Sequence, residues 1–301
     1  MGKCSKDKRD IYYRLGKSEG YRARSAYKLI QLDEQYGLFN HNVNRVIDLC
    51  AAPGSWSQVL VKKLNEARCT TTTTHAQPAK IVAVDLQPMA PIDGVIQIVG
   101  DITKLDTATE ILSYFEGEKA DLVVCDGAPD VTGLHDLDEF VQSQLLLAAL
   151  NITLSVLKPG GTFVAKIFRG RDANMIYDQL LNFFAEVDCS KPRSSRASSI
   201  EAFVVCRNYT PPEGFVPDMR HPLLMQPCTR CPSDEGTAQD LRCILDFVAC
   251  GDLSAWPDSD MNYPAPSPPA PDNPPLHSHP IAPPTEPPYK EWLLKKSRGE
   301  L

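Results

Sequence analysis

The feature that most constrains the fold is a regular alternation of short apolar runs with helical patterns between about residues 44 and 207. Six runs have the length and the Val/Ile-rich composition of buried strands: 45–50, 80–86, 95–100, 121–126, 162–168 and 200–206. Helical patterns cover 25–36, 55–66, 107–116, 137–157 and 172–185. This alternation is typical of a mostly parallel β-sheet with helices packed against it, so we predict an α/β fold.

The two ends of the chain differ in composition from this core, which we place at residues 44–208. Before it, residues 1–43 form a basic segment that includes the first helices. After it, residues 209–256 form an extension whose apolar stretch 241–253 is either a partner-docking surface or an extra element at the edge of the sheet. Residues 257–301 are so rich in proline that we predict a disordered or polyproline II tail.

The chain carries no sequence signal for a membrane or for secretion. No apolar run approaches the ~20 residues that a membrane span needs, and the charged N-terminal segment lacks a signal-peptide core. We therefore expect a cytoplasmic protein without a membrane partner, in which the ten cysteines are reduced thiols. Four of them could bind zinc, but their spacing matches no standard finger and we predict no metal site: Cys228, Cys231, Cys243 and Cys250.

Positive charge is concentrated at the start of the chain. The whole chain has a net charge of −7, whereas its first 30 residues hold nine Lys/Arg against three acids, a local charge of +6. Four tyrosines are interleaved with these bases: Tyr12, Tyr13, Tyr21 and Tyr27. Cations bind phosphates and aromatic rings stack on bases, so this segment is either an RNA-binding surface, with Arg22 and Arg24 as contacts, or a solvated amphipathic helix.

A turn of small residues follows the first predicted strand, in the run DLCAAPGSWSQ at 48–58. Such a turn lets backbone N–H groups approach a ligand at the start of the next helix. Pro53 removes one N–H and Gly54 alone supplies backbone freedom, so the turn suits a nucleoside with a neutral linker better than a diphosphate. The G-x-G-x-x-G pattern of dehydrogenases is missing.

Acids close the next three strands. Asp85 is placed to accept hydrogen bonds from ribose hydroxyls, Asp101 to reach an adenine edge, and Asp126 to lie near the charged tail of a cofactor. One acid at a strand end is commonplace and is usually a helix cap. Three in succession after a glycine turn predict a nucleoside-binding site.

Two charged residues lie in apolar strands further along the chain. Lys166 lies inside TFVAKIF, an expensive place for an unpaired charge, and Glu201 begins the last predicted strand. If these strands meet, Lys166 could have a lowered pKa and act as a base, although a nearby carboxylate such as Asp126 acts in the opposite direction. The alternative is a structural ion pair between Lys166 and Glu201.

Ordered motifs run through the first 208 residues: SKDKRDIYYR, ARSAYKL, DLCAAPGSWSQ, VAVDLQ, GDIT, DGAPDVTG, KPGG, AKIFRG and PRSSRASSIEAFVVC. Together they resemble the FtsJ/RrmJ family of RNA ribose methyltransferases, and the first and sixth look like its eukaryotic branch, which methylates the tRNA anticodon loop. The resemblance implies a Rossmann-like S-adenosylmethionine-dependent methyltransferase fold, with a mostly parallel seven-stranded sheet and helices on both faces. It also implies ribose 2′-O-methylation of nucleotides 32 and/or 34 of tRNA.

The resemblance further implies roles for individual residues. The catalytic set would be Lys28, Asp126, Lys166 and Glu201, with Lys166 as the proton acceptor and Lys28 and Glu201 positioning it and the ribose. The residues that would contact S-adenosylmethionine are Gly54, Trp56, Asp85, Asp101 and Asp126. The residues that would hold phosphates beside the catalytic strands are Arg169, Arg171, Lys191, Arg193 and Arg196.

In the eukaryotic branch the catalytic subunit works with a separate partner for each target nucleotide. The resemblance therefore implies a WD-repeat partner and a helical-repeat partner, with residues 209–256 as the candidate docking surface. A ribosomal RNA 2′-O-ribose methyltransferase of the same family would share every catalytic residue and remains an alternative. A non-catalytic RNA-binding subunit would lack the Lys/Asp/Lys/Glu set, and a small-molecule methyltransferase would not need the basic segment.

Overall fold

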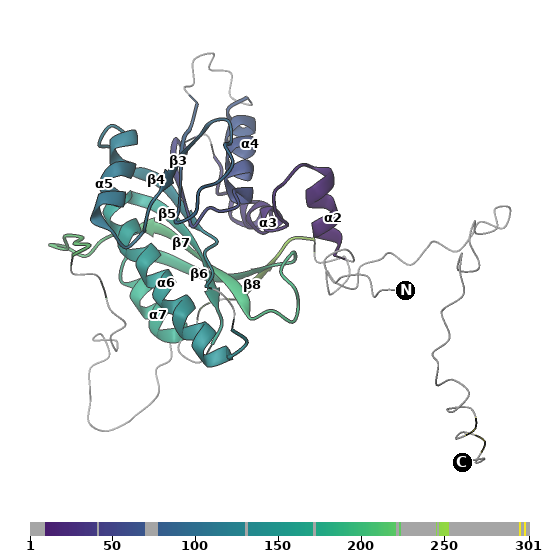
Figure 1. The fold of residues 1–301 in the computed structure, drawn as a ribbon. Helices are drawn as coiled ribbons and strands as arrows, with labels where there is room; N and C mark the ends of the chain where they lie inside the picture. Colours follow the sequence, from purple (N-terminus) through teal and green to yellow (C-terminus); the bar gives the residue numbers. More distant parts are fainter. Residues whose placement is uncertain are drawn as a thin grey trace, which may run out of the picture.

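The computed structural model describes residues 10–40, 42–69, 78–129, 132–170, 173–220 and 247–252, together with a few isolated positions. Within these ranges eight strands form one mixed sheet, in the order β3-β2-β1-β4-β5-β7-β6-β8 (Figure 1). The strands are β1 (Arg45–Leu49), β2 (Lys80–Asp85), β3 (Val95–Val99), β4 (Ala120–Cys125), β5 (Leu157–Phe168), β6 (Phe184–Pro192), β7 (Glu201–Tyr209) and β8 (Phe247–Cys250). The helices are α2 (Ile11–Ser18), α3 (Ala26–Tyr36), α4 (Ser55–Cys69), α5 (Leu105–Tyr114), α6 (His135–Val156) and α7 (Ala173–Leu181).

The strand order reverses between β1 and β4. From β1 the chain adds β2 and β3 on one side, and then returns to add β4 and β5 on the other, all parallel. β7 runs antiparallel between β5 and β6, and β8 pairs in parallel with β6 at the edge. In open sheets of this kind, ligands bind outside the carboxyl ends of the strands at the reversal point. That rule places the expected site beyond the ends of β1 and β4.

Helices cover both faces of the sheet, and each face has its own buried cluster. Because neighbouring residues of a strand point to opposite faces, Val46 of β1 belongs to the buried cluster that includes α3 and α4, while Ile47 belongs to the cluster that includes α5, α6 and α7. The predicted α/β fold with helices on both faces is therefore confirmed. α6 has the length and apolar composition that could cross a membrane, but it is the core helix of this fold, and Leu150 is 1% exposed.

The sheet has eight strands, one more than expected, and two of them were not among the predicted runs. The predicted helix 172–185 ends earlier, at Leu181, and its last residues begin β6. The apolar Phe183 and Phe184 extend the helical pattern into the start of β6, whereas the polar–apolar alternation in the rest of β6 is the strand signal that was not used. The second addition, β8, corresponds to one of the two interpretations of the stretch 241–253, an extra element at the edge of the sheet.

Some sequence predictions fall outside the described residues. These include the predicted tail 257–301, apart from the isolated positions 295 and 298, and the cysteines Cys228, Cys231 and Cys243. The fourth candidate zinc ligand, Cys250, is buried, and its sulfur accepts a hydrogen bond from Ser190 Oγ at 3.4 Å. No group of three metal-ligating side chains occurs among the residues that the structure describes.

Candidate active site at the strand ends

The four predicted catalytic residues meet in one cluster at the carboxyl end of the central strands. Lys166 Nζ lies 2.9 Å from Asp126 Oδ1, and Lys28 Nζ lies 2.7 Å from Glu201 Oε2. The two pairs also contact each other, because Lys28 Nζ is 3.9 Å from Asp126 Oδ1 and Lys166 Nζ is 4.0 Å from Glu201 Oε2. Two ammonium groups and two carboxylates therefore share one site.

Strand register explains why residues so distant in sequence meet. Cys125 of β4 pairs with Ala165 of β5, so the next residues, Asp126 and Lys166, are neighbours. On the other side of β5, Lys166 pairs with Phe203 of the antiparallel β7, two residues from Glu201 and on the same face. That face is covered by α3, and its residue Lys28 also lies 5.7 Å from the Phe203 ring centroid.

Further hydrogen bonds hold the cluster in place. Lys166 Nζ donates a second bond to the Asp126 carbonyl at 2.7 Å, and Ser195 Oγ donates to the other oxygen of Glu201 at 2.7 Å. From α6, Gln142 Nε2 donates to the carbonyls of Lys166 and Gly127. Ser195 and Gln142 carry no local sequence signal for these roles, because their partners are set by tertiary packing rather than by any local motif.

The electrostatics of the cluster correct one expectation for Lys166. Burial alone would lower its pKa, but the carboxylates of Asp126 and Glu201 outweigh burial, and the pKa is raised above the usual lysine value. Burial would raise the pKa of Glu201, but Lys28 and Lys166 outweigh it and bring that pKa down to about 2. Both groups are therefore charged at neutral pH, and of the two opposing effects expected for the Lys166 pKa, the nearby carboxylates outweigh desolvation.

The turn after β1 is packed tightly against two other segments. Gly54 has φ of 103°, and a Cβ there would lie 2.7 Å from Ile92 Cδ1 and 2.8 Å from Arg22 Nη1. Only glycine fits this position. The turn is also tied to β2, because Ala52 N–H donates to Asp85 Oδ2 at 2.8 Å. Gln87 N–H donates to Asp85 Oδ1 at 2.8 Å.

The other predicted cofactor residues divide into those at the strand ends and one in the core. Asp101 follows β3, and the Thr103 N–H and hydroxyl both donate to its Oδ1 and lower its pKa. Gly54, Asp85, Asp101 and Asp126 thus follow the ends of four neighbouring strands, β1, β2, β3 and β4. Trp56 is different: its indole is 2% exposed and donates to the Ser25 carbonyl at 2.9 Å, so a cofactor contact at this position would come from its main chain.

A buried acid beneath this turn was not identified from the sequence. Asp48 of β1 is 1% exposed, and Ser57 Oγ donates to its Oδ2 at 2.6 Å. Burial raises its pKa to about 7, a shift that the Ser57 hydrogen bond opposes and that the charges of Asp126 and Asp85 reinforce. The sequence signal that could have identified Asp48 as a buried acid is its position within the apolar run RVIDL.

The predicted phosphate-binding residues lie at different places around the site. Arg24 and Arg196 line a pocket of about 360 Å³ together with Lys28 and Glu201. Arg169 is exposed, with its guanidinium 4.9 Å from the Phe247 ring centroid. The Arg193 N–H donates to the Cys250 carbonyl, and Lys191 Nζ donates to the Ser199 carbonyl. Arg171 is outside the described residues.

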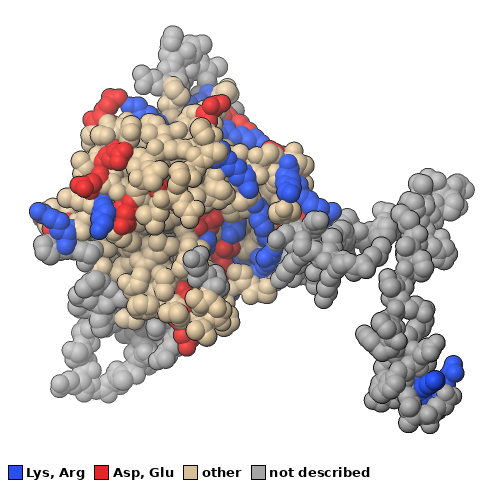
Figure 2. All heavy atoms as spheres, viewed as in Figure 1, with Lys and Arg blue, Asp and Glu red and all other residues tan. Residues whose placement is uncertain are grey.

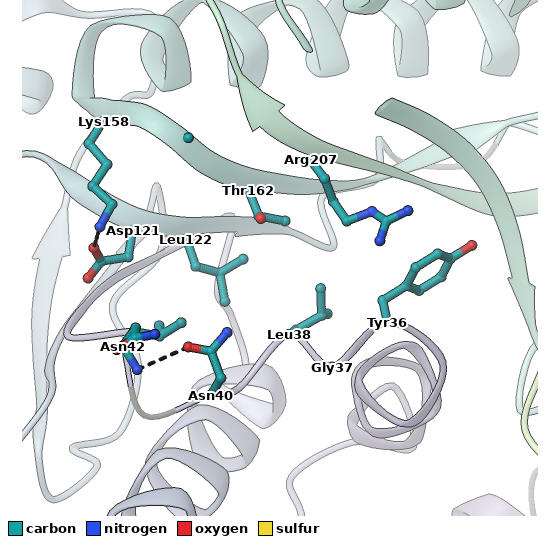
Figure 3. Close-up of a pocket in the computed structure, with 12 residues that line it drawn as sticks. Tyr36, Gly37, Leu38, Asn40, Asn42, Asp121, Leu122, Lys158, Thr162 and Arg207 are labelled. Carbon is teal, nitrogen blue, oxygen red and sulfur yellow. Dashed lines mark hydrogen bonds and ion pairs between the residues drawn. The ribbon is translucent and has the colours of Figure 1, made fainter. Parts of the chain in front are cut away.

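Figure 2 shows Lys and Arg side chains gathered on one side of the viewed face, over the region of α2 to α4 and the strand ends. A second pocket, of about 270 Å³, lies at the opposite end of the sheet (Figure 3). Among the residues that line it are Asn40, Asn42 and the ion pair between Lys158 and Asp121. Because it lies at the starts of β4 and β5, this second pocket is not part of the catalytic cluster.

Arg22 has a role that the sequence did not predict. Its Nη1 donates to the carbonyls of Pro53 and Ala90, and its Nη2 donates to that of Pro91, each at 2.9 Å. One guanidinium thus joins the turn after β1 to the loop after β2. The assignment of Arg22 as an RNA contact stays a prediction, and the structure adds a contact with the cofactor-side loops.

Sheet order, the glycine turn and the acids at successive strand ends define a Rossmann-like S-adenosylmethionine-dependent methyltransferase. The chain belongs to the FtsJ-like methyltransferases, because the model of that family matches residues 21–209. The turn at Gly54 and the carboxylates at the neighbouring strand ends fit S-adenosylmethionine, the cofactor of this family.

Similar proteins from several eukaryotes cover nearly the whole chain. A human tRNA (cytidine(32)/guanosine(34)-2′-O)-methyltransferase is 56% identical over 100% of this chain and 87% of its own length. The Schizosaccharomyces pombe protein with the same description is 55% identical over 99% of each chain. A solved structure from Plasmodium falciparum, described as a ribosomal RNA methyltransferase, has a TM-score of 0.55 at 27% identity and covers 63% of this chain and 98% of its own.

Replacing Arg22 with alanine is expected to weaken cofactor binding. The variant loses three hydrogen bonds that hold the two loops together. Since one such bond contributes roughly 1 kcal/mol or more, we expect the dissociation constant for S-adenosylhomocysteine to rise by about tenfold, measured by calorimetry. Lys17→Ala, which removes one exposed positive charge from α2, is the matched control. Equal affinities for Arg22→Ala and the unmodified chain would contradict this role.

Proposed function

We propose that this chain methylates the ribose 2′-hydroxyl of nucleotides 32 and 34 in the anticodon loop of tRNA. The observation that carries the proposal is the complete Lys28–Asp126–Lys166–Glu201 cluster, in a chain that is 55–57% identical to proteins described with that activity. A Drosophila relative described as acting on guanosine 34 is 54% identical over 72% of this chain.

The cofactor supplies a methyl group on a positively charged sulfur. The residues that would hold it are Gly54, Asp85, Asp101 and Asp126, at the ends of four neighbouring strands. Carboxylates suit this role because they accept hydrogen bonds from ribose hydroxyls and amino groups and attract the positive charge. The target ribose would then lie against Lys166, whose ammonium is at the junction between these residues and the pocket lined by Lys28 and Glu201.

In the proposed reaction the 2′-oxygen would take the methyl group as the methyl–sulfur bond breaks and S-adenosylhomocysteine leaves as a neutral thioether, and the hydroxyl proton would pass to the neutral amine of Lys166. The raised pKa of Lys166 sets a condition on this step. The ammonium must first lose a proton to solvent, because only the neutral amine can accept the hydroxyl proton. The Asp126 carboxylate, whose Oδ1 lies 2.9 Å away, stabilises the ammonium and makes this loss less favourable. Lys28 and Glu201 hold the ribose and Lys166 in position, since neither carries the proton in this scheme.

The substrate and partners are proposed on the same basis. We propose tRNA as the substrate in the cytoplasm, with WD-repeat and helical-repeat proteins selecting the nucleotide. Part of the segment 209–256 is built into the sheet as β8, so a docking surface there would include an edge of the catalytic fold. The ribosomal RNA alternative has weaker support: a yeast pre-rRNA methyltransferase is 42% identical, and the match covers only 25% of that protein's length. The complete cluster argues against a non-catalytic subunit.

Ribose methylation of tRNA should depend on Lys166 and not on lysines elsewhere in the same strand. We expect Lys166→Ala to abolish formation of 2′-O-methylated nucleosides at positions 32 and 34, measured by mass spectrometry of tRNA from cells that express each variant. Affinity for S-adenosylhomocysteine should change little, because Lys166 acts on the hydroxyl. Lys158→Ala, at the other end of β5, is the control. Normal methylation in the Lys166 variant would remove Lys166 from the mechanism. Unchanged 2′-O-methylation of nucleotides 32 and 34 in cells lacking the chain would contradict tRNA as the substrate.

The pH dependence of methyl transfer should reveal which group accepts the proton. With its pKa raised, Lys166 is almost wholly protonated at neutral pH, and the reactive amine grows about tenfold per pH unit. The single-turnover rate should therefore rise throughout the range from about pH 7 to pH 9. A rate that is flat over this range would instead favour a carboxylate acceptor such as Glu201, whose pKa of about 2 keeps it ionised throughout.

A further inference from the structure

Asp10 is a buried acid that the reaction described above does not use. It lies just before α2 and is 0% exposed. Its Oδ1 accepts a hydrogen bond from Tyr13 N–H at 3.1 Å, which caps the helix. Its Oδ2 forms ion pairs with two arginines, with Arg24 in direct contact and with Arg196 Nη2 at 3.5 Å.

These three charges come from distant parts of the chain. Arg24 precedes α3, and Arg196 lies in the turn between β6 and β7. A carboxylate buried without partners would be strongly destabilising, and two adjacent guanidinium groups without a carboxylate would repel each other. Each charge therefore depends on the others for its position. Arg24 is held further by a hydrogen bond from its Nη2 to the Ser194 carbonyl.

Both arginines line the pocket of about 360 Å³ beside the catalytic cluster. The other residues that line it are Lys28, Glu201 and three serines, Ser195, Ser198 and Ser199. Because the guanidinium groups of Arg24 and Arg196 are paired with the single carboxylate of Asp10, a net positive charge remains at the wall of this pocket. Guanidinium and hydroxyl donors together match the oxygens of a phosphate. Because Lys28 and Glu201 belong to both the pocket and the cluster, an anion bound here would be adjacent to the reacting group.

We propose that this pocket takes a backbone phosphate of the RNA strand next to the target ribose, and that Asp10 is the positioning residue that holds Arg24 and Arg196 ready for it. The inference rests on the proposed function, since it describes how the same site holds its RNA substrate. It leads to an unusual expectation: removing a negative charge from the protein should weaken its binding to a polyanion.

The test is Asp10→Asn, which keeps the size of the side chain and its ability to cap α2 but removes the charge. We expect the KM for tRNA to rise by about tenfold, as expected for loss of a charge-assisted contact, while kcat and the affinity for S-adenosylhomocysteine stay within about twofold. Glu34→Gln is the matched control, because it neutralises an exposed acid on α3. General electrostatics alone would make both variants bind tRNA equally well or slightly better than the unmodified chain.

A double-substitution cycle separates positioning from loss of stability. If Asp10 acts through the arginines, the combined effect of Asp10→Asn and Arg196→Ala on tRNA binding should be smaller than the product of their separate effects. Independent effects that multiply would contradict the inference. If Asp10→Asn lowers the melting temperature, Asp10→Glu serves as the second variant, because it keeps the charge but displaces it. We expect Asp10→Glu to raise the KM for tRNA without changing kcat or the affinity for S-adenosylhomocysteine.

The outcomes also separate this inference from the proposed function. An unmodified chain that does not methylate tRNA would contradict the proposed function itself. An unmodified chain that methylates tRNA, together with an Asp10→Asn variant that has the same KM, would contradict only the role of Asp10. Weakened tRNA binding in Glu34→Gln to the same extent as in Asp10→Asn would also overturn it, because the effect would then not be specific to the two arginines.

Discussion

Lys166 lies within an apolar strand of the central sheet, and its ammonium group is tolerated there because Asp126 and Glu201 surround it. This pairing determines much of the architecture of the site. It requires β4, β5 and β7 to bring their ends together in the observed register, and it requires α3 to place Lys28 above them. An ion cluster of this kind fixes geometry well, but it also stabilises the charged form of the lysine and so leaves little neutral amine at neutral pH to accept a proton.

The N-terminal segment connects the two halves of the site. Arg22 hydrogen-bonds to the loops after β1 and β2, on the cofactor side. Two residues later, Arg24 contacts Asp10 and lines the pocket on the proposed RNA side. A segment with a local charge of +6 is therefore more than a surface for phosphates, because part of its charge organises the folded site.

The sequence predicted the parts of the structure that local patterns encode. Six strands follow from apolar runs, and the acids at strand ends follow from the parallel topology, which brings those ends to one edge. β6 was missed because its first residues were assigned to the preceding helix, although its polar–apolar alternation is typical of a half-buried strand. The role of Arg22 could not be predicted because its partners are backbone carbonyls, and that of Asp10 because its partners lie far away in sequence. The direction of the Lys166 pKa shift depends on distances of a few ångströms, which no motif specifies.

The carboxylates around Lys166 keep it protonated in the folded protein. The most direct measurement is an NMR titration of the Lys166 ammonium in a protein with ¹⁵N-labelled lysine, assigned with Lys166→Ala. A midpoint above the usual lysine value of about 10.4, falling in the Asp126→Asn variant, is the result that the structure predicts. A midpoint below that value in the unmodified protein would show that desolvation dominates and would contradict the account.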